Sequence, residues 1–370
     1  MINVRRSVGV SGRVDRKAAL ITALLLLIGL VILYSASAPF SLKHYGSDTY
    51  MLFKQFLAAI AGIALLLFFS WFDYHRLAAI NDVLFLGAIG LTLLTILPLG
   101  IGEGRWLWVG PFALQPTELL KFALIIYLAA AISRKRESIR SFRLGVLPFI
   151  AVLALLGGIV LNQPDLGMLL VYGALTIAML FLGGANAWHL ASIGGASLPL
   201  VALAIWFAPY RFARILSFLD PQAYSTSSGY QTIQSLIAVG SGGVLGRGLG
   251  ASRAKLFYLP QAHNDFILSV VAEEAGLLGT LAVLGLIGLL VWRAFVVSEQ
   301  ASDRLGQLLA LGIGFVIGFQ ALLNAGVVLG LLPVTGLTLP FFSNGGSSLL
   351  VTLAMVGVLL NVSRRGTVTG

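Results

Sequence analysis

Long apolar runs separated by short polar segments recur along most of the chain. A helix that crosses the hydrocarbon core of a bilayer needs about 20 mostly apolar residues. Because backbone groups in lipid have no water to bond to, such runs must be helical. The pattern predicts an all-α, polytopic integral membrane protein with about ten spans, at residues 18–38, 51–71, 83–99, 117–132, 144–161, 166–182, 188–207, 266–292, 308–332 and 347–362.

Composition supports this fold class and excludes several others. The 370 residues are 58% hydrophobic and only 10% charged, whereas soluble proteins carry about 25% charged residues. The chain has no cysteine, which excludes disulfides and thiolate metal sites. The net charge of +10 comes from basic clusters between apolar runs. Such clusters fit loops beside anionic lipid headgroups better than a nucleic-acid-binding face, so no nucleic acid partner is expected.

The lysines and arginines concentrate on one side of the predicted membrane. If the N-terminus is cytoplasmic, most of them fall in cytoplasmic loops, including the basic run at 134–143. The positive-inside rule therefore predicts that both termini are cytoplasmic. The chain then divides into a basic tail (1–17), one ten-helix membrane domain (18–363) and a short tail (364–370). A large extracytoplasmic loop, residues 208–264, joins the seventh and eighth spans and is too long for a simple connection.

The first apolar run has an alternative interpretation. Basic residues, among them Arg5 and Arg6, precede it, and it ends in Ala36-Ser37-Ala38, which resembles a signal peptide with its cleavage site. The run is long for a signal peptide and nine further spans follow. We therefore expect an uncleaved first span.

Polar residues stand where every second predicted span begins, which the topology places at the outer side of the membrane. These residues are Lys54 at the second span, Gln115, Glu118 and Lys121 at the fourth, Gln163 and Asp165 at the sixth, His263 and Asp265 at the eighth, and Ser343, Gly345, Gly346 and Ser347 at the tenth. Ionisable groups within a membrane are energetically costly and mark functional cavities by default. The shared depth of these residues predicts such a cavity.

Several of these residues also have a purely structural interpretation. Glu118 in a first helical turn favours the helix dipole and can pair with Lys121, three residues on. Asp165 can cap the helix that follows it. His263 and Asp265 are too close in sequence to be a favoured dyad, because neighbouring side chains on a helix point apart. The glycine- and serine-rich segment 343–348 can be a helix cap or an anion site.

Asp265 is the best candidate for a general base. It stands where the long loop returns to the membrane, and partial burial would raise its pKa toward a useful range. Glu273 and Glu274 lie two turns deeper, and pairing with a lysine or arginine of a neighbouring helix is their expected role. No P-loop and no metal-binding motif is present, so nucleotide-driven chemistry is unsupported.

A cavity of this kind fits a lipid-linked anionic substrate. Lys54, Arg105 and Lys121 could stabilise a pyrophosphate leaving group, and Asp265 could take the proton of an acceptor hydroxyl. The same features are compatible with a transporter, because secondary transporters also place ionisable groups on broken helices.

Ordered motifs along nearly the whole chain resemble one family. They are Gly104-Arg105-Trp106-Leu107, Gln115-Pro116-Thr117-Glu118 with Lys121, Gln163-Pro164-Asp165, Tyr258-Leu259-Pro260, His263-Asn264-Asp265, Glu273-Glu274, Gly336-Leu337-Thr338-Leu339-Pro340 and Gly345-Gly346-Ser347-Ser348. With the ten-span pattern, they are similar to the SEDS family (shape, elongation, division and sporulation) of integral-membrane peptidoglycan glycosyltransferases. The Tyr258 and Gly336 stretches look more like the division branch than the elongation branch. Asn344 and Gln261 depart from the residues usual in the family.

The resemblance implies polymerisation of lipid II at the outer face of the bacterial cytoplasmic membrane, with a β-1,4 bond formed and undecaprenyl pyrophosphate released. It implies a class B penicillin-binding protein as transpeptidase partner, among other membrane proteins of division or elongation. Asp265 matches the family's essential aspartate, and Glu118, Lys121 and Asp165 match positions linked to substrate handling. A lipid II flippase, a role also proposed for the family, is the alternative. Whether a divalent cation such as Mg²⁺ or Mn²⁺ takes part stays open, and no other cofactor is expected.

Overall fold

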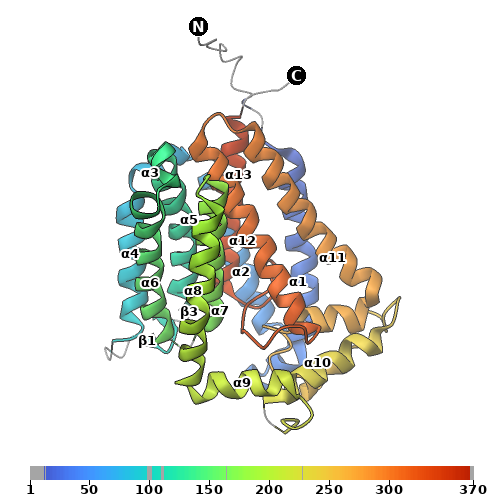
Figure 1. Cartoon of the computed structure of the whole chain (residues 1–370). Helices are drawn as coiled ribbons and strands as arrows, with labels where there is room; N and C mark the ends of the chain where they lie inside the picture. The colour runs from blue at the N-terminus through green and yellow to red at the C-terminus, as the bar shows by residue number, and fades with distance from the viewer. Residues whose placement is uncertain are drawn as a thin grey trace.

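The computed structural model describes residues 12, 14–97, 102–109, 112–163, 165–226 and 228–366. Most of these residues are helical, and the long helices run side by side in one bundle (Figure 1). The helices are α1 (Arg16–Tyr45), α2 (Tyr50–Trp71), α3 (Tyr74–Ala79), α4 (Asn81–Leu94), α5 (Pro116–Lys135), α6 (Leu147–Leu161), α7 (Leu166–Leu182), α8 (Ala187–Trp206), α9 (Pro209–Leu219), α10 (Ser228–Gly242), α11 (Ile267–Gln300), α12 (Arg304–Val328) and α13 (Gly346–Arg364). A 3₁₀ turn, η1 (Arg136–Arg140), and two π turns, η2 (Phe142–Val146) and η3 (Ala254–Tyr258), complete the helical segments.

Seven of the described helical segments are long and apolar enough to cross a membrane: α1, α2, α5, α6 together with η2, α11, α12 and α13. Helices α4 and α7 are apolar but shorter. The remaining predicted span, 188–207, coincides with α8. Each predicted apolar run therefore corresponds to a helix, and the chain is a mostly helical, multi-pass membrane protein. The end of the third predicted span, 98–99, lies outside the described residues.

The strictly all-α prediction was wrong in one place. Between α4 and α5 lies a small antiparallel sheet in the order β1 (Gly102–Glu103), β2 (Trp106–Val109) and β3 (Phe112–Leu114), with Leu107 opposite Leu114. Aromatic and β-branched residues favour strands, and Gly104 adopts the positive φ of 62° needed in the β1–β2 turn. This turn carries Arg105.

The predicted loop 208–264 is folded for much of its length, because it contains α9, α10 and η3. Helix α10 packs against α11. The helical geometry of α11 is interrupted at Gly276, with φ 66° and ψ −164°. A side chain there would collide with the backbone of Gly246 and Val244. The loop thus packs tightly against the broken part of α11.

Helix α1 begins and α13 ends at the same end of the bundle (Figure 1). The backbone N–H of Asp15 donates to Ser363 Oγ at 3.0 Å, and Arg293 Nη2 lies 2.6 Å from Asp15 Oδ2. The small sheet, α9 and α10 lie at the opposite end (Figure 1). Helix α1 also packs against α2 and α11. Helix α1 is thus part of the helical bundle, and the uncleaved first span stays a prediction.

Candidate active site

Three charged side chains from separate segments face one place at the end of the bundle that holds the small sheet. Arg105 comes from the β1–β2 turn, Asp165 immediately precedes α7, and Asp265 lies just before α11. Arg105 Nη1 is 3.4 Å from Asp165 Oδ2. A Cβ built on Gly336 would lie 3.7 Å from Asp265 Oδ2 and 3.8 Å from Arg105 Nη1. Gly336, in the loop between α12 and α13, therefore lies next to both of these side chains.

Asp165 is held on both carboxylate oxygens. Its Oδ1 accepts a hydrogen bond from the Met168 N–H at 3.2 Å, which caps α7, as the structural interpretation predicted. Its Oδ2 accepts from Gln115 Nε2 at 3.2 Å and from Arg105. Burial raises the pKa of Asp165, although the Arg105 charge and the Met168 N–H oppose the rise. The carboxylate orients the guanidinium of Arg105 toward Gly336.

Asp265 is partly buried and anchored through its backbone. The side-chain amide of Asn324, on α12, donates to the Asp265 carbonyl at 2.7 Å and to the Leu337 carbonyl at 2.9 Å. Burial raises the pKa of the Asp265 carboxyl, Arg105 and Arg214 lower it, and Asp165 raises it further. The net rise is the direction expected for a general base.

Sequence reasoning missed Asn324 and Arg214 as site residues. Asn324 is a buried amide in an apolar helix, and that isolated polar position was the available signal. Arg214 lies on α9 and donates to the Val334 carbonyl at 3.2 Å. No local pattern marked Arg214, because its closeness to Asp265 depends on how the long loop folds.

The segment before α13 supports the position of Asp265. Ser343 Oγ donates to the Asn264 carbonyl at 2.6 Å and accepts from the Leu339 N–H at 2.8 Å. The Asn344 N–H donates to the His263 carbonyl at 2.9 Å. These bonds fix the chain on either side of the carboxylate-bearing residue.

The start of α13 also contacts α2 and the small sheet. The Gly345 N–H donates to Gln55 Oε1 at 3.3 Å. Ser347 Oγ accepts from the Gln115 N–H at 3.0 Å and donates to the Ala113 carbonyl at 3.3 Å. A Cβ on Gly346 would meet the Ala58 side chain at 3.5 Å. These contacts thus connect the start of α13 with α2 and with the segment from β3 to α5.

Glu118 and Lys121 form a buried ion pair, as their spacing predicted. Lys121 Nζ lies 2.5 Å from Glu118 Oε2 and donates to Gln320 Oε1, on α12, at 2.9 Å. The Lys121 side chain is fully buried and that of Glu118 is 3% exposed. Contact between Lys121 and a substrate would require this pair to open. The pair joins α5 to α12.

Three other predicted residues, Lys54, Trp106 and Gln163, have contacts of their own. Lys54 Nζ lies 4.9 Å from the centre of the Tyr50 ring. The Arg105 guanidinium is 6.0 Å from the Trp106 ring centre. Gln163 donates to the Thr92 carbonyl at 3.0 Å, which ties the start of α7 to α4.

His263 is buried and packs against Phe40, with ring centres 4.6 Å apart and ring planes tilted by 40°. Burial and the nearby His44 lower the pKa of His263 to about 4. The ring is therefore neutral near pH 7. Its packing on α1 agrees with the expectation that it does not form a dyad with Asp265.

Glu273 and Glu274 form a second buried cluster. Glu274 Oε1 lies 2.7 Å from Lys255 Nζ and accepts from Ser35 Oγ on α1. Glu273 accepts from Ser252 Oγ at 2.6 Å. The predicted pairing with basic residues is confirmed, but the partner comes from the long loop and not from a neighbouring spanning helix. The cluster fastens the loop to α11 and α1.

Among the described residues, no group of three or more His, Asp and Glu side chains is placed to hold a metal ion. Asp165 and Asp265 are the two carboxylates near Arg105, and the arginine lies 3.4 Å from the first of them.

Fold and site together define a multi-pass membrane protein with a carboxylate–arginine site at one end of its helices. Residues 16–367 match the sequence profile of the FtsW, RodA and SpoVE family, described as cell cycle protein. The chain belongs to this family.

Relatives and solved structures agree with this membership along most of the chain. The chain is 42% identical to a probable peptidoglycan glycosyltransferase FtsW of Geobacter metallireducens, covering 95% of each chain. It is 41% identical to stage V sporulation protein E of Bacillus subtilis, covering 95% of this chain and 97% of the relative.

Two solved structures share the fold. The first belongs to a study of how a peptidoglycan synthase complex coordinates polymerisation and crosslinking (TM-score 0.77, 32% identity, 95% of this chain and 98% of that chain). The second is the rod shape determining protein RodA of Thermus thermophilus (TM-score 0.67, 29% identity, 95% and 97%).

Proposed function

We propose that this protein is a peptidoglycan glycosyltransferase that polymerises lipid II into glycan strands for septal wall synthesis in cell division. The observation that carries the proposal is the convergence of Arg105, Asp165 and Asp265 beside Gly336, from segments far apart in sequence. Family membership and relatives named as glycosyltransferases support the same activity.

Asp265 acts as the general base in this proposal. Its carboxylate takes the proton of an acceptor sugar hydroxyl, whose oxygen attacks the anomeric carbon of the donor. A β-1,4 bond forms with inversion, and the bond to undecaprenyl pyrophosphate breaks. The raised pKa of Asp265 suits a base working near neutral pH.

Arg105 stabilises the negative charge that develops on the departing pyrophosphate. An arginine presents several N–H donors in a fixed plane, which matches phosphate oxygens. Its side chain is 32% exposed, so it can reach a ligand, while the 1% exposed Asp165 carboxylate holds it. Asp165 and Gln115 are then positioning residues. Lys54 is a second candidate cation for the pyrophosphate.

Glu118 and Lys121 support the site from inside the bundle, and Ser343, Gly345, Gly346 and Ser347 shape the wall against which the substrate lies. This assignment follows from their contacts, since each joins two segments that border Asp265 or Arg105. If a divalent cation, Mg²⁺ or Mn²⁺, takes part, the carboxylate of Asp165 or Asp265 would hold it, and it would supply positive charge for the substrate phosphates. Titration of Mg²⁺ after chelation is the direct measurement.

The topology belongs to the same proposal. Ten helices, namely α1, α2, α4 to α8 and α11 to α13, span the bacterial cytoplasmic membrane, with both termini cytoplasmic. Residues 18–363 form one membrane domain, and the end that carries Asp265 faces outward. The excess of basic residues at the opposite end supports this orientation.

The partner is proposed to be a class B penicillin-binding protein, within a larger assembly of division proteins. The similar solved structure from a peptidoglycan synthase complex supports this. The partner would crosslink the strands that this chain polymerises.

The test is polymerisation of lipid II by the purified protein with its partner. Asp265→Asn should lower the rate by about 10²- to 10⁴-fold, the usual contribution of a general base. Asp220→Asn, an exposed carboxylate in the same loop, should leave the rate unchanged.

Folding of Asp265→Asn is checked by thermal unfolding. Since burial raises the pKa of Asp265, ionisation is less favourable in the folded protein than in the unfolded chain. The stability contribution of this group is therefore greatest at low pH and declines as pH rises through the raised pKa. At pH 7 the asparagine variant should be at least as stable as the wild type. Full polymer yield from a folded Asp265→Asn protein, or lipid II translocation without polymerisation by the wild type, would reject the assignment.

A further inference from the structure

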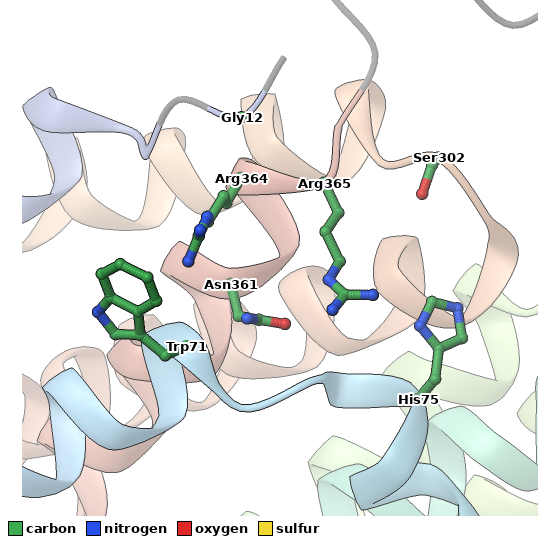
Figure 2. A pocket seen from close by; sticks show the side chains of 7 residues that line it. All are labelled: Gly12, Trp71, His75, Ser302, Asn361, Arg364 and Arg365. Atoms are coloured by element: carbon green, nitrogen blue, oxygen red, sulfur yellow. The ribbon is translucent and has the colours of Figure 1, made fainter. Parts of the chain in front are cut away.

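At the end of the bundle opposite Asp265 lies a cavity of about 520 Å³. Figure 2 shows the side chains that line it. The cavity lies where α2 and α13 end and where α11 connects to α12. The side chains or backbone of Gly12, Trp71, His75, Ser302, Asn361, Arg364 and Arg365 line it. Nothing in the proposed polymerisation reaction uses these residues.

The carboxylates beside this cavity are already paired. Asp73 Oδ2 lies 2.8 Å from Arg365 Nη1. His75 lies between Asp73, at 2.9 Å, and Asp303, at 2.5 Å. Asp303 also accepts from the Gly306 N–H and so caps α12. The positive charge of Arg365 is therefore taken up by Asp73, and His75 contacts both Asp73 and Asp303.

Arg364 provides the unneutralised charge of the cavity. Among the residues that the structure describes, no carboxylate lies within 4.0 Å of it. Its guanidinium stacks on Trp71 instead, 4.2 Å from the ring centre. Figure 2 shows the two side chains next to each other on one side of the cavity. Arg16 and Lys17 are exposed at the adjoining start of α1 and add positive charge.

An apolar groove of about 500 Å³ continues from the same tryptophan. Leu67, Phe68, Trp71 and Phe72 line it on the last turns of α2. The tryptophan is 71% exposed, and Leu67 and Phe68 are each 53% exposed. Tryptophan is the residue typical of the boundary between headgroups and hydrocarbon. A cationic cavity and an apolar groove therefore meet at a residue suited to that boundary.

We propose that this composite site binds one anionic phospholipid. Its phosphate lies in the cavity against Arg364, since arginine pairs strongly with phosphate oxygens. One acyl chain follows the groove along Leu67 and Phe68 toward the hydrocarbon. In the proposed topology the lipid belongs to the cytoplasmic leaflet, where anionic lipids attract basic residues. The inference uses that topology and does not depend on glycosyl transfer.

The ligand would also bridge α2 and α13, two helices that already pack against each other in the bundle. Arg364 belongs to α13, Trp71 to α2, and Ser302 to the connection between α11 and α12. A bound headgroup would bridge the first two directly. Lipid binding should therefore raise the thermal stability of the protein.

The test uses the full-length protein in nanodiscs of phosphatidylcholine that contain a small fraction of brominated lipid. Bromine quenches nearby tryptophan fluorescence, and subtraction of the Trp71→Phe signal isolates Trp71 from the other tryptophans. Brominated phosphatidylglycerol should quench Trp71 more than brominated phosphatidylcholine does at the same fraction. Arg364→Gln should weaken the apparent affinity for phosphatidylglycerol by about five-fold, the effect of one basic residue at a membrane surface.

Arg143→Gln is the matched control. Arg143 is exposed at the same end of the bundle but does not line the cavity, so the preference for phosphatidylglycerol should persist in this variant. Equal quenching by both lipids in the wild type would overturn the proposal, as would unchanged selectivity in Arg364→Gln. Displacement of the lipid by millimolar glycerol 3-phosphate would also overturn it, because that result would identify a site for a soluble phosphate.

Discussion

At the scale of single residues, the site depends on a balance of charge around Asp265. Desolvation raises the pKa of this carboxyl, and Arg105 and Arg214 restrain the rise. Asp165 has two opposite effects on the pKa of Asp265. Its own negative charge raises that pKa, while its contact with Arg105 holds in place a positive charge that lowers it. In the proposed reaction, Arg105 therefore acts on the base Asp265 as well as on the leaving group.

This dual role predicts a pH effect. In Arg105→Gln the pKa of Asp265 should rise further, because a restraining positive charge is lost. The acid limb of the kcat/KM profile should then move to higher pH by about one unit, together with a lower maximum. The pH dependence of lipid II polymerisation is the measurement, with Arg143→Gln as the control. An acid limb that stays at the wild-type pH would contradict the role of Arg105 toward Asp265.

At the scale of elements, polar side chains join helices within an otherwise apolar bundle. The Glu118–Lys121 pair of α5 reaches Gln320 on α12. Asn324, one turn further along α12, holds the chain at Asp265 and Leu337. A single helix therefore connects the buried ion pair with the candidate base.

Breaking the buried pair should destabilise the protein. Lys121→Ala leaves the buried Glu118 carboxyl without its partner, and breaking a buried pair in this way costs about 3–5 kcal/mol. The double variant Glu118→Gln with Lys121→Met removes both charges and should recover most of that loss. Thermal unfolding in detergent measures the difference. If both variants unfold at the same temperature, the charge pair is not the source of the effect.

At the scale of the whole molecule, the orientation of the bundle in the membrane determines which substrates each end of the bundle can meet. In the proposed function, the end with Asp265 faces outward, where it would meet lipid II. The end with Arg364 must then face the cytoplasm. The absence of native cysteine makes this orientation directly measurable.

Single cysteines introduced at Ser225 and Ser138 should react differently in intact cells. Both positions are exposed, Ser225 in the long loop and Ser138 in η1, at the opposite end. A membrane-impermeant maleimide should label Ser225→Cys from outside and Ser138→Cys only after permeabilisation. The reverse pattern would place Asp265 in the cytoplasm and exclude the proposed reaction there.

The sequence by itself determined the positions of the helices, because about 20 apolar residues in lipid have no alternative to helical structure. It also determined the contacts that one helix makes internally, such as the pair at Glu118 and Lys121 and the cap at Asp165. It indicated that polar residues of distant segments share one depth, because successive spans alternate in direction.

Only the tertiary structure decided which of those residues meet. Arg105 reaches Asp165 through a β-turn too short for an apolar pattern to reveal. Arg214 approaches Asp265 because α9 folds across the end of the bundle, and Lys255 reaches Glu274 in the same loop. Hydrophobic periodicity specifies which residues leave water, whereas the pairing of charges depends on how the segments pack around them.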